Sequence, residues 1–200
     1  FEAGAGYASE GIQATVNFFF MDFRDEIIRS GRLDRFGQPI TGNANKTRHL
    51  GVELTVSAQL TEGLEIHGNT TISRNRLAKY TVYIGGVPQS LDGNTIAGFP
   101  DFLGNIRVSY SHGGLYAALS VQSVGEFYTD NFQKSSNADP NRTVNAYHVV
   151  HGWIGYKPPI TLLGRSLEAR VQVNNLLNEI YASHGEGDDF FPAAERNVFA

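Results

Sequence analysis

The sequence predicts an all-β fold in which antiparallel strands follow one another as an up-and-down meander. Residues 49–60, HLGVELTVSAQL, place apolar side chains at every second position, which is the period of a strand with one apolar and one polar face. Similar stretches recur along the 200 residues. Their connections alternate between short and long, so all short turns of a meander fall on one rim and all long loops on the other. A Greek-key sandwich does not produce this order.

Nine strands are expected from this pattern. We place them at about 1–8, 11–29, 45–60, 64–78, 102–112, 115–129, 144–157, 166–181 and from 194 onward. The short connections are 8–10, 61–63, 112–114 and the slightly longer 157–165. The long connections lie near 30–44, 79–101, 130–143 and 182–193, and they are rich in Gly, Asn, Asp, Ser and Pro.

Four of these strands, taken in chain order, repeat the two-faced pattern of residues 49–60. Their apolar positions are Ala14, Val16, Phe18 and Phe20 in the strand at 11–29; Leu64, Ile66 and Ile72 in that at 64–78; Leu115, Ala117, Leu119 and Val121 in that at 115–129; and Leu167, Ala169, Val171 and Val173 in that at 166–181. The intervening positions carry mainly Thr, Ser, Asn and Gln with scattered charges. The sheet should therefore have one apolar face and one polar face.

Composition excludes several classes of protein. A net charge of −4 leaves no basic patch for nucleic acid. The chain has no cysteine, so it has neither disulfides nor a thiolate metal site. Its strongest apolar run, VNFFFM at 16–21, is far shorter than the roughly 18 residues of a membrane-spanning helix. A membrane role would have to use strands.

Three features favour a transmembrane barrel whose apolar face meets lipid. The polar face lacks the Lys and Glu density of a soluble exterior. Several expected strands have about 15 residues, against the usual five or six. Aromatic residues also gather near strand ends, as in interfacial girdles. They are Tyr7, Phe23, Tyr80, Tyr110, Phe127, Tyr128, Tyr147, Tyr156 and Tyr181. The alternative is a soluble β-barrel or sandwich that binds a small apolar ligand or sugar, with a buried interior lined by Val52, Leu54, Val56, Leu119 and Val121.

Several segments together resemble the TonB-dependent outer-membrane receptors. GVELTVSA at 51–58, with the preceding Asn45, Arg48 and Gly51 spacing, resembles a characteristic strand of that family. FEAGAGY at 1–7 and VNFFFMDFRDEI at 16–27 are similar to the two strands before it. VQVNNLLNEIYA at 171–182 and FPAAERNVFA at 191–200 resemble the penultimate strand and the start of the final one.

The resemblance implies that residues 1–200 form a partial receptor barrel, about the last nine strands of a barrel of roughly 22. The chain starts without Met and ends within a strand, so we expect the plug domain and the end of the final strand to lie outside it. The short turns would face the periplasm. The long loops would face outward.

The implied function is active uptake of a scarce solute across the bacterial outer membrane, most often a ferric siderophore or similar iron chelate. The implied partners are outer-membrane lipid and lipopolysaccharide, the small-molecule or metal-chelate substrate, and the TonB-ExbB-ExbD energy-coupling complex, which would act through the missing plug. No enzyme activity and no cofactor are expected. A passive porin or an outer-membrane enzyme would keep the barrel and change only the activity.

No residue pattern points to catalysis or to a metal centre. Ser, His and Asp occur without a nucleophile elbow. His148 and His151 are three residues apart in an expected strand, so they face opposite sides and cannot chelate one metal together. The acidic tip formed by Glu186, Asp188 and Asp189 could hold calcium, but its spacing favours a solvated loop.

A transporter needs polar and aromatic groups at the outward mouth of its lumen, where the solute is first desolvated. By strand parity, we expect four residues to contact the substrate there: Asn75, Glu126, Tyr128 and Tyr147.

Overall fold

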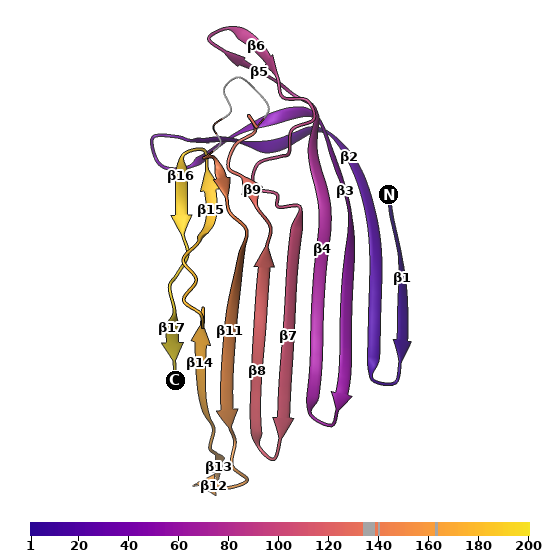
Figure 1. Cartoon of the computed structure of the whole chain (residues 1–200), viewed down its shortest axis with the longest axis vertical. Coiled ribbons are helices and arrows are strands. Elements are labelled where there is room, and N and C mark those ends of the chain that lie inside the picture. Colours follow the sequence, from indigo (N-terminus) through magenta and orange to yellow (C-terminus); the bar gives the residue numbers. More distant parts are fainter. Residues whose placement is uncertain (134–138, 140, 163) are drawn as a thin grey trace.

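The computed structural model describes residues 1–133, 139, 141–162 and 164–200, and among them nine strands form one open antiparallel sheet (Figure 1). Their order is β1 (Glu2–Ser9), β2 (Ile12–Leu33), β3 (Pro39–Thr61), β4 (Leu64–Lys79), β7 (Phe102–His112), β8 (Leu115–Val124), β11 (Tyr147–Tyr156), β14 (Ala169–Asn174) and β17 (Asn197–Phe199). Sequence neighbours in this list are also neighbours in space. The predicted all-β meander is confirmed.

The two rims differ as the alternation of connections predicted. Short turns join β1 to β2, β3 to β4 and β7 to β8 at the lower end in Figure 1, where the 157–168 connection carries the small ladder of β12 (Thr161–Leu162) and β13 (Arg165–Ser166). The upper rim carries three further ladders. These are β5 (Thr81–Ile84) with β6 (Val87–Ser90), β9 (Phe127–Tyr128) with β10 (Thr143–Val144), and β15 (Ala182–Glu186) with β16 (Asp189–Pro192).

The loop expected at 30–44 is wrong, because β2 and β3 continue as a long hairpin. Pairing extends to Arg29↔Thr41 and resumes at Leu33↔Pro39. The turn at 34–38 is tight because the Asp34 carboxylate accepts the backbone amides of Phe36 (2.7 Å) and Gln38 (2.9 Å). This hairpin bends across the upper end of the sheet in Figure 1.

The strand expected at 166–181 is also too long. β14 ends at Asn174, and both Asn175 and Asn178 have left-handed backbone conformations, with φ of 52° and 56°. The Asn175 side chain then fixes a turn: its amide donates to the Glu179 carbonyl, and its oxygen accepts the Glu179 N–H, both at 2.8 Å. The last strand accordingly starts at Asn197 rather than 194.

Register separates an apolar from a polar face of the sheet. Leu54 lies opposite Val16, and Leu119 lies opposite Val108 and Gly152. Leu54 and Leu119 are 40% and 48% exposed, so no part of the described chain covers the apolar face over them. The soluble alternative expects a buried interior lined by Val52, Leu54, Val56, Leu119 and Val121, but among the described residues Leu54 and Leu119 are exposed and the three valines are half-buried.

The long-rim loops fold over the polar face instead. Val124, Tyr147 and Val149, whose side chains point to that face, are buried against Phe127 and Val144. A second buried cluster lies where the sheet meets the upper loops, and it consists of Ile28, Ala44, Leu77, Leu91 and Ile96. The loops therefore rest on packed cores rather than on polar contacts alone. Among the described residues no helix is long and apolar enough to cross a membrane.

Candidate functional site

Asn131 joins three upper segments at the loop rim. Its side-chain amide donates to the Arg29 carbonyl (2.7 Å), its side-chain oxygen accepts the Ala97 N–H (2.9 Å), and its backbone carbonyl accepts the Asn94 side-chain amide (2.7 Å). Asn131 is 1% exposed, so these bonds lie out of competition with water. The segments around 29, 94–97 and 131 thus form one rigid unit.

Arg142 clamps two further loop segments together. Its guanidinium donates two parallel hydrogen bonds to Asp188, each 2.8 Å, and a third to Asp130 at 2.8 Å. The hydrogen bonds to Asp188 and Asp130 raise the pKa of Arg142, and the pKa of Asp188 is lowered in return. Thr129 and Gly187 add two bonds between the same segments, of 2.6 and 2.9 Å.

The acidic tip is not a wholly solvated loop. Glu186 is 2% exposed, and its carboxylate accepts the Gly31 N–H at 2.9 Å and lies 3.7 Å from the Arg29 guanidinium. Burial raises the pKa of Glu186, and the Gly31 hydrogen bond offsets part of that rise. Asp188 is paired with Arg142. In the part of the chain that the structure describes, no group of three or more acidic or His side chains is arranged to hold a metal.

His184 and Glu186 hold the β15–β16 hairpin against Arg29 and Gly31 of the β2–β3 hairpin. The stability of this contact should depend on pH, and the two side chains should shift it in opposite directions. The His184 ring lies between those of Phe127 and Phe191, and Arg29 donates to its Nε2. Burial, assisted by the charge of Arg29, lowers the pKa of His184 below 6.5. We call the β15–β16 hairpin closed when it packs against the β2–β3 hairpin and open when it has separated from it. Just below pH 6.5 the closed loop therefore binds fewer protons than the open loop. The raised pKa of Glu186 has the reverse effect above 4.5.

Glu186→Gln should therefore expose the His184 contribution alone. In this variant, the free energy of opening at the Gly187 amide should fall as the pH drops below about 6.5, because the open loop gains a proton that the closed loop resists. Hydrogen exchange, corrected for the intrinsic pH dependence of exchange, measures it. Adding His184→Gln should flatten the profile. A flat profile in Glu186→Gln itself would contradict the arrangement.

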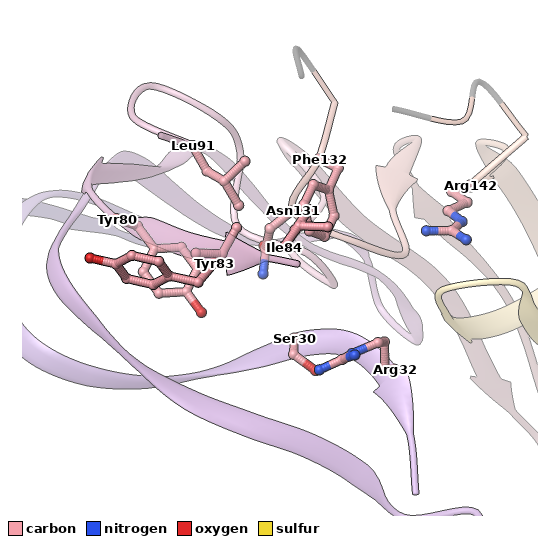
Figure 2. Close-up of a pocket in the computed structure, with 10 residues that line it drawn as sticks. Ser30, Arg32, Tyr80, Tyr83, Ile84, Leu91, Asn131, Phe132 and Arg142 are labelled. Atoms are coloured by element: carbon pink, nitrogen blue, oxygen red, sulfur yellow. The ribbon is translucent and has the colours of Figure 1, made fainter. Parts of the chain in front are cut away.

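A cavity of about 390 Å³ opens among the upper segments (Figure 2). Arg32 and Ser30 lie on one side of it, and the aromatic rings of Tyr80, Tyr83 and Phe132 lie across from them. The remaining lining residues are Val82, Ile84, Leu91, Asn131 and Arg142. The cavity is thus built from β2, from the β4–β7 connection and from the β8–β11 connection.

Some polar groups that line this cavity have no partner among the described residues. The Ser30 hydroxyl is buried and has no hydrogen-bond partner within the described residues. Arg32 makes no ion pair with the described part of the chain, whereas Arg142 is already bonded to two carboxylates. Burial raises the pKa of Tyr80, and the charge of Arg32 reduces that rise, so the phenol stays a neutral donor. A cation with no ion pair among the described residues, together with a tyrosine hydroxyl and aromatic rings, suits an anionic ligand with apolar or aromatic parts.

The four residues predicted to contact substrate do not converge on this cavity. Asn75 is buried on the polar face and bonds to His49 (2.8 Å) and Ser73 (3.0 Å). Glu126 is exposed between β8 and β9. Tyr128 is half-buried in β9. Tyr147 lines a separate cavity of about 390 Å³, with its ring centroid 4.3 Å from that of Tyr181.

Sequence reasoning missed the cavity residues. Arg32, Tyr80 and Tyr83 lie in or beside stretches interpreted as long loops, where strand parity gives no direction to a side chain. The aromatic pair Tyr80–Tyr83 inside a Gly- and Pro-containing connection was the available signal. The strand register confirms that His148 and His151 face opposite sides of the sheet. His148 pairs with Ser123 and His151 with Ser120, and these two pairs point to different faces.

An exposed apolar face, a polar face covered by loops, and strands joined in a simple meander define the class of outer-membrane β-barrels. A family model described as "TonB dependent receptor-like, beta-barrel" matches residues 1–176. The chain therefore belongs to the family of TonB-dependent receptor β-barrels, which are proteins of the bacterial outer membrane. Proteins of this family are transporters and not enzymes. No curated protein matches the chain.

Solved structures that resemble the chain share this fold. The siderophore receptor PiuA from Acinetobacter baumannii matches with a TM-score of 0.73 and 14% identity, over 98% of this chain and 27% of that one. The ferric yersiniabactin uptake receptor FyuA from Yersinia pestis matches with 0.70 and 19%, over 98% and 28%. The copper transporter OprC matches with 0.69 and 19%, over 98% and 29%. The chain thus spans less than a third of each of these structures.

Proposed function

We propose that this chain forms the C-terminal part of the barrel of an active transporter that imports a ferric siderophore or a similar iron chelate. The long loops capture the solute, and a plug domain outside residues 1–200 closes the lumen. The TonB-ExbB-ExbD complex then pulls on the plug and releases the solute through the barrel. Outer-membrane lipid and lipopolysaccharide surround the apolar face.

The cavity bounded by Arg32, Tyr80, Tyr83 and Phe132 carries this proposal. Siderophore complexes of iron are bulky, frequently anionic and often aromatic, so they fit a site that combines a cation with ring faces. Arg32 supplies the charge that Arg142, held by Asp130 and Asp188, does not. Similarity in fold to PiuA and FyuA, both named as siderophore or ferric-chelate receptors, supports the choice of solute.

Asn75, Glu126, Tyr128 and Tyr147 are proposed as contacts on the solute's way from the cavity into the lumen. Asn75 and Tyr147 lie on the polar face of β4 and β11. Tyr147 and Tyr181 together offer an aromatic surface beside a cavity of their own.

Binding to the full-length receptor tests the solute. We expect one of three gallium(III) complexes, those of a tris-catecholate, a tris-hydroxamate or citrate, to quench the protein's tryptophan fluorescence saturably. Arg32→Gln should weaken that binding about tenfold, which is the loss of one charge-assisted contact. Arg35→Gln is the matched control, because Arg35 lies on the Phe36 ring (4.6 Å) at the hairpin turn and outside the cavity. Failure of all three complexes to bind, or equal losses in both variants, would contradict the proposal.

Energy coupling separates this proposal from a passive porin. Cells that produce the full-length receptor should accumulate the matching 55Fe chelate above its external concentration, and deletion of TonB should abolish the accumulation. Uptake that only equilibrates, and that is unchanged without TonB, would identify a porin.

A further inference from the structure

The cavity beside Tyr147 and Tyr181 lies at the loop rim and has about the same volume, 390 Å³, as the loop cavity that contains Arg32. We call it the tyrosine cavity. Its walls come from three segments, which are residues 143–147, residues 179–182 and Phe190 of β16. Arg142 lines the loop cavity and the next residue, Thr143, lines the tyrosine cavity, so the two cavities adjoin each other.

The two cavities differ in the sign of their charge. The loop cavity is lined by Arg32 and Arg142 and by no acidic residue of the described chain. The tyrosine cavity has the opposite lining, because Glu179 is the only charged residue that the described chain contributes to it. A negatively charged group therefore fits the first cavity, and a positively charged group fits the second.

Glu179 is held in place by its backbone, which leaves its carboxylate free. The Asn175 side-chain oxygen accepts the Glu179 N–H, and the Asn175 amide donates to the Glu179 carbonyl, each at 2.8 Å. The Glu179 side chain is exposed and makes no hydrogen bond or ion pair within the part of the chain that the structure describes. The carboxylate is thus positioned at the cavity without a partner of its own.

Aromatic rings complete the tyrosine cavity. The ring centroids of Tyr147 and Tyr181 are 4.3 Å apart, and Tyr147 is buried in the cluster that contains Val144. Phe190 adds a third ring to the lining. Ring faces attract cations, and an organic ammonium ion can contact rings and a carboxylate together. A metal ion would need several oxygen or nitrogen ligands, and the described residues contain no group of three or more acidic or His side chains arranged for one.

We propose that the tyrosine cavity binds an ammonium group of the imported chelate. This inference rests on the proposed function and narrows its substrate class: the solute carries an anionic chelate part, which enters the loop cavity, and a pendant amine, which enters the tyrosine cavity. The Arg142–Asp188 clamp keeps the two parts in register, because these residues lie one and two positions from Thr143 and Phe190 in the chain. Chelates without the amine should bind less tightly.

Matched gallium(III) complexes test the proposal on the full-length receptor. A tris-catecholate and a tris-hydroxamate are each prepared with one pendant primary amine, either free or acetylated, and titrated by tryptophan fluorescence. We expect the free amine to bind about tenfold more tightly than the acetylated form, which is the gain from one charge-assisted contact. Glu179→Gln should remove this advantage and leave the affinity of the acetylated form unchanged. Glu195→Gln, at an exposed residue outside both cavities, should keep it.

Equal binding of the free and acetylated forms would overturn the proposal, and so would equal losses of both forms in Glu179→Gln. If no complex binds in either form, the proposed function fails, and the ammonium site is then tested without a chelate. Saturation-transfer NMR with cadaverine, a small diamine, should give a signal that Glu179→Gln abolishes and Glu195→Gln keeps. No signal from the unmodified receptor, or the same signal from Glu179→Gln, would show that the cavity does not bind ammonium groups.

Discussion

Leu54→Arg should prevent most of the full-length receptor from inserting into lipid vesicles. Leu54 lies midway along the outward face of β3, is 40% exposed and has apolar Val16 beside it. An arginine at that depth costs about 2–4 kcal/mol in a transmembrane barrel. The folding equilibrium should therefore fall roughly 30- to 700-fold. Urea titration of folding in vesicles, followed by the gel mobility shift of the folded barrel, measures it.

Thr55→Arg is the matched control for this prediction. Thr55 is the next residue on the same strand, but its side chain points to the polar face, opposite Thr15 and Asn69. A cation there can reach lumen water, so we expect a change within about 1 kcal/mol. Equal losses in the two variants would mean that the two faces have been assigned wrongly or that neither meets lipid.

Gly63→Ala should be the most damaging alanine substitution among the short turns. Gly63 lies in the β3–β4 turn with φ of 83°, and a Cβ there would come within 1.9 Å of the Ser111 carbonyl oxygen. Ser111 cannot simply withdraw, because its N–H donates to the Gly63 carbonyl at 2.7 Å. The variant incurs about 1–2 kcal/mol for the left-handed backbone and a further 1–3 kcal/mol for the clash.

Gly86→Ala separates these two contributions. Gly86 has the same φ of 83° in the β5–β6 turn, but a Cβ there would have no atom within 4 Å. The free energy of unfolding of the Gly86→Ala variant should therefore fall only by the about 1–2 kcal/mol that alanine costs in the left-handed backbone conformation. Urea denaturation of both variants gives the difference, and equal destabilisation would show that β7 does not pack against the β3–β4 turn.

Most of the fold could be predicted from the alternation of apolar and polar residues along the strands. In β2, β3, β4 and β8 the period-two pattern predicted both the strands and the direction in which their side chains face, because every second side chain meets a different solvent. It failed where local hydrogen bonds decide the chain path. The Asp34 carboxylate turns the expected 30–44 loop into a hairpin tip, and the Asn175 side chain stops β14 early. Neither effect has a signature in hydrophobic periodicity.

The candidate site was harder to predict, because it depends on contacts between distant segments. Parity correctly placed Asn75 and Tyr147 on the polar face. Strand parity gave no information on the loop cavity. Arg32 and Tyr80 are brought together by the hydrogen bonds of Asn131 to three segments and by the bend of the β2–β3 hairpin. The spacing of Glu186, Asp188 and Asp189 predicts a solvated loop, yet the Glu186 carboxylate accepts the N–H of Gly31, which is 155 residues away in the chain.

Which face of the sheet meets lipid is the central question, and nitroxide scanning of the full-length receptor in vesicles tests it most directly. Labels would be placed singly at Leu54, Ile106 and Val171, and at the adjacent polar-face positions Thr55, Asn105 and Gln172. The first three should be relaxed mainly by oxygen, which concentrates in lipid, and the second three mainly by a water-soluble nickel chelate. Loss of this alternation, or its reversal, would contradict the assignment of the apolar face to lipid.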